Sequence, residues 1–157
     1  MRNQRTLRGP VTFRGTGLHF GREVTTIVKP ADADTGVVFV RTDLPGQPRI
    51  PMRGESALKR DRRTAISNGE AEVETVEHLA AGLWMLGIDN VTVEIDGPEL
   101  PALDGSALPF AEGLRDAGRV DQKAWRKVFV LDQPVAVSEG EASLTAFPYE
   151  ARSHSTS

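Results

Sequence analysis

The spacing of apolar residues changes between residues 75 and 95, and this change constrains the possible folds more than any other feature of the sequence. From about Thr75 to Leu86 the apolar side chains recur at helical spacing and share one face at ~100° per residue. Glu74 or Thr75 is a plausible N-cap, and Gly87 is a typical helix stop. From Asn90 to Ile95 apolar and polar residues alternate, as in a strand with one buried face. A helix that leads directly into such a strand predicts helix-on-sheet packing. The apolar helix positions are Val76, Leu79, Ala80, Leu83 and Leu86.

Further strands are predicted before this helix. Residues 24–28 and 37–40 are rich in β-branched residues and are bounded by Gly and Pro. Residues 64–67 and 70–73 flank Asn68-Gly69, which is the strongest two-residue hairpin signal in the sequence.

The remaining elements complete the predicted fold class. Residues 44–51 contain three Pro and one Gly and are expected to form a loop. Residues 107–117 predict a second helix, closed by Gly118. Strands first, then helices between strands, are typical of an α+β fold in which helices cover one face of a mostly antiparallel sheet. The expected architecture is therefore a two-layer sandwich.

The chain of 157 residues is predicted to hold one complete domain and the beginning of another. We expect the first domain at residues 1–120, a linker at 121–126 and the truncated start of a second domain at 127–150. Two short strands are expected within 124–137, around Asp132-Gln133-Pro134, and another at 142–147. The tail at 151–157 is polar without an apolar period and is expected to be aberrant or disordered, with a frameshift as one hypothesis.

Composition excludes several classes of function. A net charge of -3 argues against a general nucleic-acid binder. Since the sequence has no Cys, a bound metal would need His, Asp or Glu ligands. No window approaches the ~20 apolar residues of a membrane span, and no apolar signal core follows the first residues. A cytoplasmic protein without an integral membrane segment is expected.

Glu77 and His78 are the first candidates for chemistry. Both project away from the apolar face of the predicted helix, and a solvated polar surface is the simpler interpretation of such a pair. The functional interpretation is a metal-ligating His beside a carboxylate that takes a proton from an attacking water. The only other His residues are His19 and His154.

Four segments in a fixed order strengthen the functional interpretation. They are Gly15-Thr16-Gly17-Leu18-His19-Phe20-Gly21, Thr75-Val76-Glu77-His78-Leu79, Leu86-Gly87-Ile88-Asp89-Asn90-Val91 and Glu99-Leu100-Pro101-Ala102-Leu103-Asp104-Gly105-Ser106. From about residue 6 to residue 150 the sequence resembles the UDP-3-O-acyl-N-acetylglucosamine deacetylase family, zinc enzymes of lipid A synthesis. The resemblance implies two similar α+β domains, ribosomal protein S5 domain 2-like, with Zn²⁺ at their junction.

The resemblance also implies roles for individual residues. Glu77 matches the general base, His78 the first zinc ligand, and His19 a position near the substrate. Asp104 matches a position that borders the active site and helps to orient or bind substrate. The other zinc ligands and a general acid are expected from the missing part of the second domain, and His154 does not match them. Taken singly, the Gly15–Gly21 segment could be only a turn, and Asp104-Gly105-Ser106 only a turn and helix cap.

The expected function is zinc-dependent removal of the N-acetyl group of UDP-3-O-acyl-N-acetylglucosamine, with release of acetate. The alternatives are an inactive fragment and a non-catalytic domain that binds sugar nucleotides or a protein partner. No oligomeric state is predicted. Residues 59–63 are basic and could face the diphosphate of the substrate, but a solvated loop is the simpler interpretation.

Overall fold

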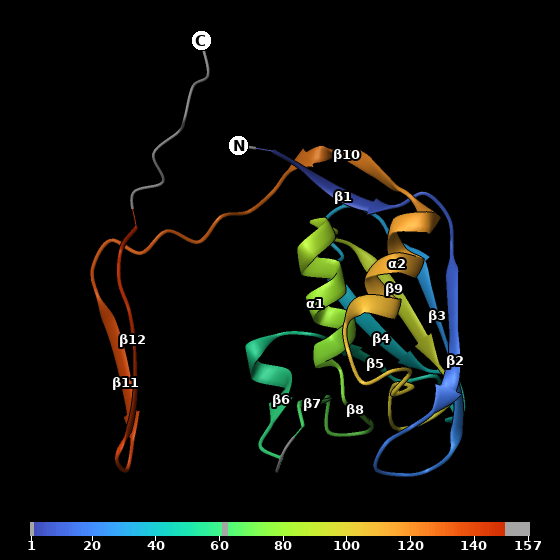
Figure 1. Ribbon diagram of the computed structural model, residues 1–157. Coiled ribbons are helices and arrows are strands. Elements are labelled where there is room, and N and C mark those ends of the chain that lie inside the picture. Colours follow the sequence, from blue (N-terminus) through green and yellow to red (C-terminus); the bar gives the residue numbers. More distant parts are fainter. Residues whose placement is uncertain (1, 61–62, 150–157) are drawn as a thin grey trace. The chain divides into compact units, whose positions relative to one another are not determined.

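The computed structural model describes residues 2–60 and 63–149. The chain divides into two units, Met1–Arg126 and Lys127–Ser157. The first unit is α+β, as predicted, and is built on a five-stranded mixed sheet (Figure 1). Strand β9 is parallel to β4, and every other neighbouring pair in this sheet is antiparallel. In spatial order the strands are β2 (Val11–Thr16), β3 (Glu23–Pro30), β9 (Val91–Ile95), β4 (Val37–Arg41) and β5 (Arg49–Pro51).

Two helices, α1 (Glu77–Leu86) and α2 (Leu108–Ala117), cover one face of this sheet (Figure 1). Each buries the apolar face that its helical spacing predicts, Leu79 and Leu83 from α1 and Phe110 and Leu114 from α2. The helices approach closely at Gly82, where an added Cβ would lie 3.3 Å from the backbone N of Ala111. Within the part of the chain that the structure describes, no helix is long and apolar enough to cross a bilayer.

The ends of α1 agree only partly with the sequence prediction. Gly87 closes the helix in the left-handed conformation, with φ 63°, as predicted. The prediction of Glu74 or Thr75 as N-cap is wrong, because the N-cap is Val76 and no side chain caps the first turn. Glu74 and Thr75 are instead buried, and the Thr75 hydroxyl donates a hydrogen bond elsewhere.

A separate two-stranded ribbon joins the two ends of the first unit. Strand β1 (Asn3–Leu7) pairs antiparallel with β10 (Arg119–Trp125). Most of the predicted linker at 121–126 therefore lies in a hydrogen-bonded strand. Strand β10 was not predicted, because most of its side chains are exposed and few are apolar. The chain divides into its two units directly after this strand, at Arg126.

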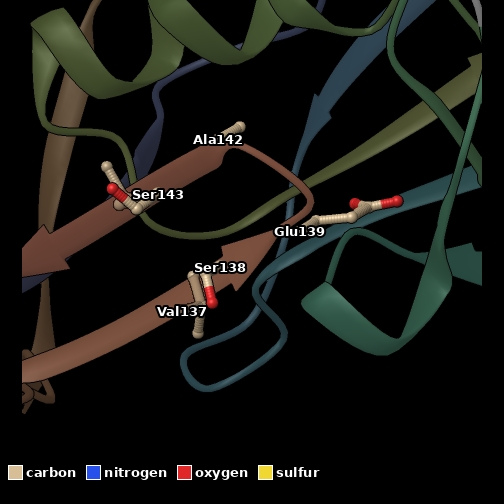
Figure 2. Close-up of a pocket in the computed structure, with 6 residues that line it drawn as sticks. Val137, Ser138, Glu139, Ala142 and Ser143 are labelled. Carbon is tan, nitrogen blue, oxygen red and sulfur yellow. The ribbon is translucent and has the colours of Figure 1, made fainter.

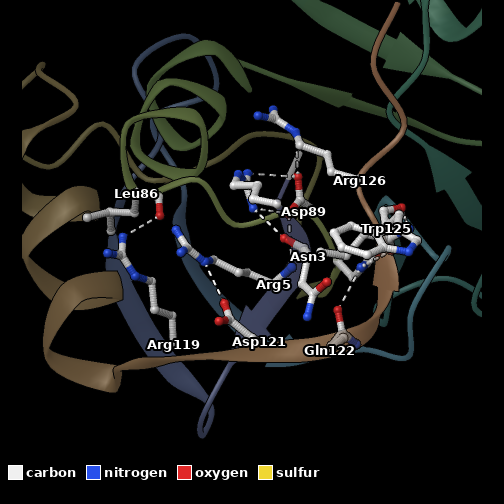
Figure 3. A network of polar contacts seen from close by, with 12 residues as sticks. Asn3, Arg5, Leu86, Asp89, Arg119, Asp121, Gln122, Trp125 and Arg126 are labelled. Atoms are coloured by element: carbon white, nitrogen blue, oxygen red, sulfur yellow. Dashed lines mark hydrogen bonds and ion pairs between the residues drawn. The ribbon is translucent and has the colours of Figure 1, made fainter. Parts of the chain in front are cut away.

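Asp89 fastens this ribbon to the end of α1 (Figure 3). Its carboxylate accepts hydrogen bonds from both terminal nitrogens of Arg2, at 2.9 and 3.2 Å, and from the backbone N of Arg5 at 2.9 Å. The Nε of Arg126 lies 3.0 Å from the same carboxylate. Because Asp89 follows α1 by three residues, these contacts fix the end of the ribbon at which β1 begins and β10 ends against the helix terminus.

The segment before α1 forms a small sheet of β6 (Ala57–Leu58), β7 (Ala65–Ser67) and β8 (Glu72–Glu74), preceded by a 3-10 turn at Gly54–Ser56. The predicted hairpin at Asn68-Gly69 is confirmed, but its loop spans residues 68–71 instead of two residues. The Asn68 side chain accepts hydrogen bonds from the backbone N of Glu70 and of Ala71, both at 2.9 Å, and so stabilises the longer loop.

The prediction of a loop throughout residues 44–51 is wrong at its end. Arg49–Pro51 forms β5, an edge strand paired with β4. An edge strand needs hydrogen bonds on one side only, so it tolerates a proline that lacks the N–H donor.

The described part of the second unit is a single hairpin. Strands β11 (Val135–Glu139) and β12 (Ala142–Ala146) pair antiparallel around Gly140, which has a φ of 59°. Of the two strands expected around Asp132-Gln133-Pro134, the one after Pro134 is confirmed as the start of β11, and the one before Asp132 is wrong, because residues 126–134 form no strand. The expected strand at 142–147 is confirmed as β12.

No side chain is buried within residues 127–149. A hollow on this hairpin is lined by its own strands, at Val137, Ser138, Glu139, Ala142, Ser143 and Leu144 (Figure 2). Whether residues 127–150 begin a second domain of the same fold stays a prediction. Residue 150 and the predicted aberrant tail at 151–157 lie outside the described residues.

The Asp89 contacts predict the effect of one substitution. Asp89→Ala should lower the free energy of unfolding by about 2 kcal/mol, because hydrogen bonds to a partly buried carboxylate are lost and two guanidinium groups lose their partner. Urea denaturation of the chain measures this change. The matched control is Asp116→Ala, which removes only an exposed ion pair with Arg115 and should change stability by less than about 0.5 kcal/mol. Equal effects of the two variants would contradict this role of Asp89.

Candidate functional site

Three segments that are distant in the sequence are hydrogen-bonded to one another beside the start of α1. The segment at 97–106 is common to them. Its Ala102 N donates to Thr16 O at 3.0 Å, and its Leu100 N donates to Glu74 O at 3.2 Å. In the reverse direction Glu74 N donates to Pro98 O at 2.8 Å. The glycine-rich segment, the segment that leads into α1, and the Asp-Gly-Ser segment therefore meet in one place.

Glu77 and His78 are the first two residues of α1, and both are half-buried. The Oε2 atom of Glu77 accepts a hydrogen bond from the backbone N of Thr64 at 3.3 Å, which ties the carboxylate to the strand region before β7. A helix N-terminus favours negative charge, because its first backbone N–H groups lack partners within the helix.

Asp104 lies on an exposed turn near His78. The backbone N–H and the hydroxyl of Ser106 both donate to Asp104 Oδ1, each at 2.9 Å. These two hydrogen bonds lower the pKa of the Asp104 carboxyl below its ordinary value of 3.8, and the nearby His78 adds a smaller lowering. His78 is therefore close enough to Asp104 to contribute to its electrostatic environment.

The turn interpretation of Asp104-Gly105-Ser106 is also correct. Gly105 has a φ of 81°, and its N donates to Ala102 O at 2.8 Å. The Ser106 hydroxyl oxygen accepts a hydrogen bond from Leu108 N at 3.1 Å, at the start of α2. One short turn thus both leads into α2 and holds the Asp104 carboxylate in place.

His19 lies in an exposed loop whose backbone is hydrogen-bonded to the Glu99 side chain. The Glu99 Oε2 atom accepts hydrogen bonds from the backbone N of His19 at 2.9 Å and of Phe20 at 3.1 Å. The other carboxylate oxygen of Glu99 accepts from the Thr75 hydroxyl at 2.9 Å. Glu99 was not predicted as a site residue, although an acidic residue among Pro98, Leu100 and other apolar residues indicates that a charge could be buried there.

The basic stretch at 59–63 is largely engaged within the protein. Arg60 pairs with Glu72 at 2.7 Å, and Arg63 pairs with Glu74 at 2.6 Å. Residues 61 and 62 lie outside the described residues. The cations of Arg60 and Arg63 thus have carboxylate partners of their own.

The donor set for a metal is incomplete among the residues that the structure describes. Glu77 and His78 are adjacent, and Asp104 is near His78. Within residues 2–60 and 63–149, however, no group of three or more His, Cys, Asp or Glu side chains is placed to hold a metal ion. A His next to a carboxylate at a helix start, with a second carboxylate nearby, is the kind of partial site from which metal-dependent hydrolases are built.

Comparison with known proteins identifies the family. Residues 4–157 match the family model described as UDP-3-O-acyl N-acetylglycosamine deacetylase. The chain is 49% identical to UDP-3-O-acyl-N-acetylglucosamine deacetylase of Thermosynechococcus vestitus over 145 residues, which are 92% of this chain and 51% of that protein. The chain belongs to the UDP-3-O-acyl-N-acetylglucosamine deacetylase family.

Two other relatives carry the same name. The protein of Phenylobacterium zucineum is 45% identical over 94% of this chain and 51% of its own length. The protein of Geotalea uraniireducens is 43% identical over 92% of this chain and 47% of its own length. The chain therefore spans about half the length of the curated relatives it matches.

Gly17 provides a test of the loop geometry. A Cβ at this position would lie 2.5 Å from Glu99 Oε2, so Gly17→Ala should force the loop and the buried carboxylate apart and cost about 1–3 kcal/mol of stability. Gly9→Ala is the control, since a Cβ there meets nothing within 4 Å. Chemical denaturation of both variants gives the comparison, and a Gly17→Ala variant as stable as Gly9→Ala would show that the close approach does not exist.

Asp104 should titrate at a lower pH than an ordinary Asp. Since its pKa is lowered on folding, its contribution to stability is present above the ordinary pKa and is lost as the pH falls through the lowered one. Ser106→Ala removes the hydroxyl donor and should raise the Asp104 pKa, whereas Ser138→Ala should leave it unchanged. Carbon-detected NMR titration of the Asp104 carboxyl measures both, and an unchanged pKa in Ser106→Ala would contradict the assignment.

Proposed function

We propose that the full-length protein hydrolyses the N-acetyl group of UDP-3-O-acyl-N-acetylglucosamine and releases acetate, a step of lipid A biosynthesis in the cytoplasm. The observation that carries this proposal is the placement of Glu77 and His78 together at the start of α1, near Asp104, in a chain that belongs to the deacetylase family. Each relative compared above is named for this substrate.

Zn²⁺ is part of the proposal. His78 offers an imidazole nitrogen, which is a common zinc ligand. The carboxylate of the neighbouring Glu77 forms no ion pair among the described residues, and it can therefore accept a proton. Catalytic zinc sites usually have about three protein ligands. The remaining ligands would come from outside the described residues, since these contain no group of three. When bound, the ion would polarise the acetamide carbonyl and lower the pKa of water.

In this proposal Glu77 acts as the general base. Its carboxylate removes a proton from the water that attacks the acetamide carbonyl carbon, and the hydrogen bond from Thr64 N holds it in place. The C–N bond of the tetrahedral intermediate then breaks. The sugar nitrogen leaves as an amine after protonation by a general acid from the part of the protein beyond this chain, and the acyl carbon leaves as acetate.

His19 and Asp104 are proposed to contact the substrate or to orient groups around it. His19 belongs to a loop whose backbone is bonded to Glu99, and Asp104 is held by Ser106 in the turn before α2. We further propose that the first unit has the ribosomal protein S5 domain 2-like sandwich, and that residues from 127 onward begin a second domain of the same kind.

The base assignment is tested in the full-length protein. Glu77→Gln keeps the size of the side chain but cannot accept the proton, so turnover should fall by roughly 10²–10⁴-fold while zinc content is retained. The control is Glu112→Gln on the exposed face of α2, which should keep normal turnover. Turnover is followed by acetate release, and zinc by atomic absorption.

His78→Ala separates metal binding from proton transfer, because it should lose zinc together with activity. Normal turnover in Glu77→Gln would refute the base assignment. A wild-type protein that binds the UDP-sugar but releases no acetate would instead support the non-catalytic alternative.

A further inference from the structure

Glu99 is a buried carboxylate that joins two segments of the candidate site. Its exposed fraction is only 2%. One oxygen accepts the backbone N–H groups of His19 and Phe20, and the other accepts the Thr75 hydroxyl. His19 belongs to the loop assigned to the substrate, and Thr75 lies two residues before Glu77. The Glu99 side chain thus links the loop assigned to the substrate with the segment that leads to the proposed general base.

The chemistry of this link is unusual for a purely structural contact. Within residues 2–60 and 63–149, no Arg, Lys or His forms an ion pair with Glu99, so neutral donors alone compensate the loss of water around the carboxylate. Burying a charge in this way is costly, and an apolar side chain of similar volume would fill the same space at a lower cost. An apolar side chain could not, however, hold two N–H groups and a hydroxyl at fixed separations.

The backbone on both sides of Glu99 is adapted to the link. Thr75 has a φ of 59°, which is unfavourable for a β-branched residue and is kept only where the surroundings enforce it. On the loop side, Gly17 has no Cβ, and an added one would lie 2.5 Å from Glu99 Oε2. The strained Thr75 and the closely approaching Gly17 thus both contact, or lie directly against, the Glu99 carboxylate.

We propose that Glu99 is a positioning residue that sets the separation between the substrate loop at His19 and the catalytic pair at the start of α1. Glu99 does not touch substrate. It acts by fixing the Thr75 backbone, from which Glu77 and His78 follow, relative to the backbone of His19. This inference rests on the proposed deacetylase function and adds to it a residue that determines how the two halves of the first unit's site are aligned.

The substitutions Glu99→Leu and Glu99→Gln distinguish positioning from packing. Leu keeps the apolar volume but accepts no hydrogen bond. Gln can keep the link, because its amide oxygen can accept the loop N–H groups while its amide NH₂ donates to the Thr75 hydroxyl oxygen. In the full-length protein, Glu99→Leu should lower kcat/KM by about 10–100-fold with zinc content unchanged, and Glu99→Gln should recover most of this loss.

Two further variants locate the effect. Thr75→Val removes only the hydroxyl donor and should reproduce part of the Glu99→Leu loss. Asp96→Ala is the matched control, since it removes a carboxylate that accepts a backbone hydrogen bond from Thr25 and reaches neither His19 nor Thr75. The control should keep wild-type kcat/KM.

A double-mutant cycle with His19→Ala tests whether Glu99 acts through the loop. If it does, Glu99→Leu should reduce kcat/KM by less than about threefold in a chain that already lacks the His19 side chain. Losses that multiply in full would overturn the proposal, as would a Glu99→Gln variant no more active than Glu99→Leu. Should Glu99→Leu fail to fold, Glu99→Gln and Thr75→Val carry the same test.

Hydrogen exchange gives a readout that does not depend on activity. The amides of His19 and Phe20 should exchange at least tenfold faster in Glu99→Leu than in wild type, and those of α1 should be unchanged. Unchanged exchange at His19 and Phe20 would overturn the link itself. If the wild-type protein releases no acetate, the proposed function fails, and the exchange rates still decide whether Glu99 holds the loop.

Discussion

The packing of α1 against the sheet is the interaction on which the rest of the structure depends. Glu77 and His78 are the first residues of this helix, so the placement of the helix determines where they lie. Leu79 and Leu83 are almost completely buried beneath α1, and full burial of such a side chain is worth about 1.5–3 kcal/mol. A typical hydrogen bond contributes ~1 kcal/mol. The apolar core therefore decides that the helix lies on the sheet.

The polar contacts around the 97–106 segment decide a finer matter, which is how the first turn of α1 is placed. Backbone hydrogen bonds connect this segment to Glu74 on one side and to Thr16 on the other. Such bonds are directional, whereas burial of apolar surface is not. The backbone of Glu74 and the hydroxyl of Thr75 are both held by such bonds directly before α1 begins. Precision at the site thus comes from polar groups whose net contribution to stability is small.

The fold was predictable from the sequence where apolar periodicity was strong. Helix α1, its stop at Gly87 and strand β9 follow from the spacing of residues 75–95, and the Asn68-Gly69 turn identified the hairpin of β7 and β8. Strands β1 and β10 were not predicted, because their pairing joins residues more than a hundred positions apart and β10 is polar along most of its length. The short edge strand β5 was not predicted, because the prolines of its segment indicated a loop, whereas an edge strand tolerates them. These strands form because distant segments pair with one another, and such pairing leaves no local pattern in the sequence.

The candidate site was predictable as a set of residues but not as an arrangement. Glu77, His78, His19 and Asp104 could be named because each lies in a segment whose composition matches a family. What connects them is a carboxylate, Glu99, that bonds to Thr75 across 24 positions and to His19 across 80. The connecting residue shows no local pattern, since its donors are two backbone amides and one hydroxyl from other segments. A buried Glu among apolar neighbours marks only that some partner must exist, because an uncompensated carboxylate would destabilise the fold. The donors that bond to Glu99 are brought to it by the topology of the chain. The alignment of the His19 loop with the start of α1 therefore follows from the structure and not from the sequence alone.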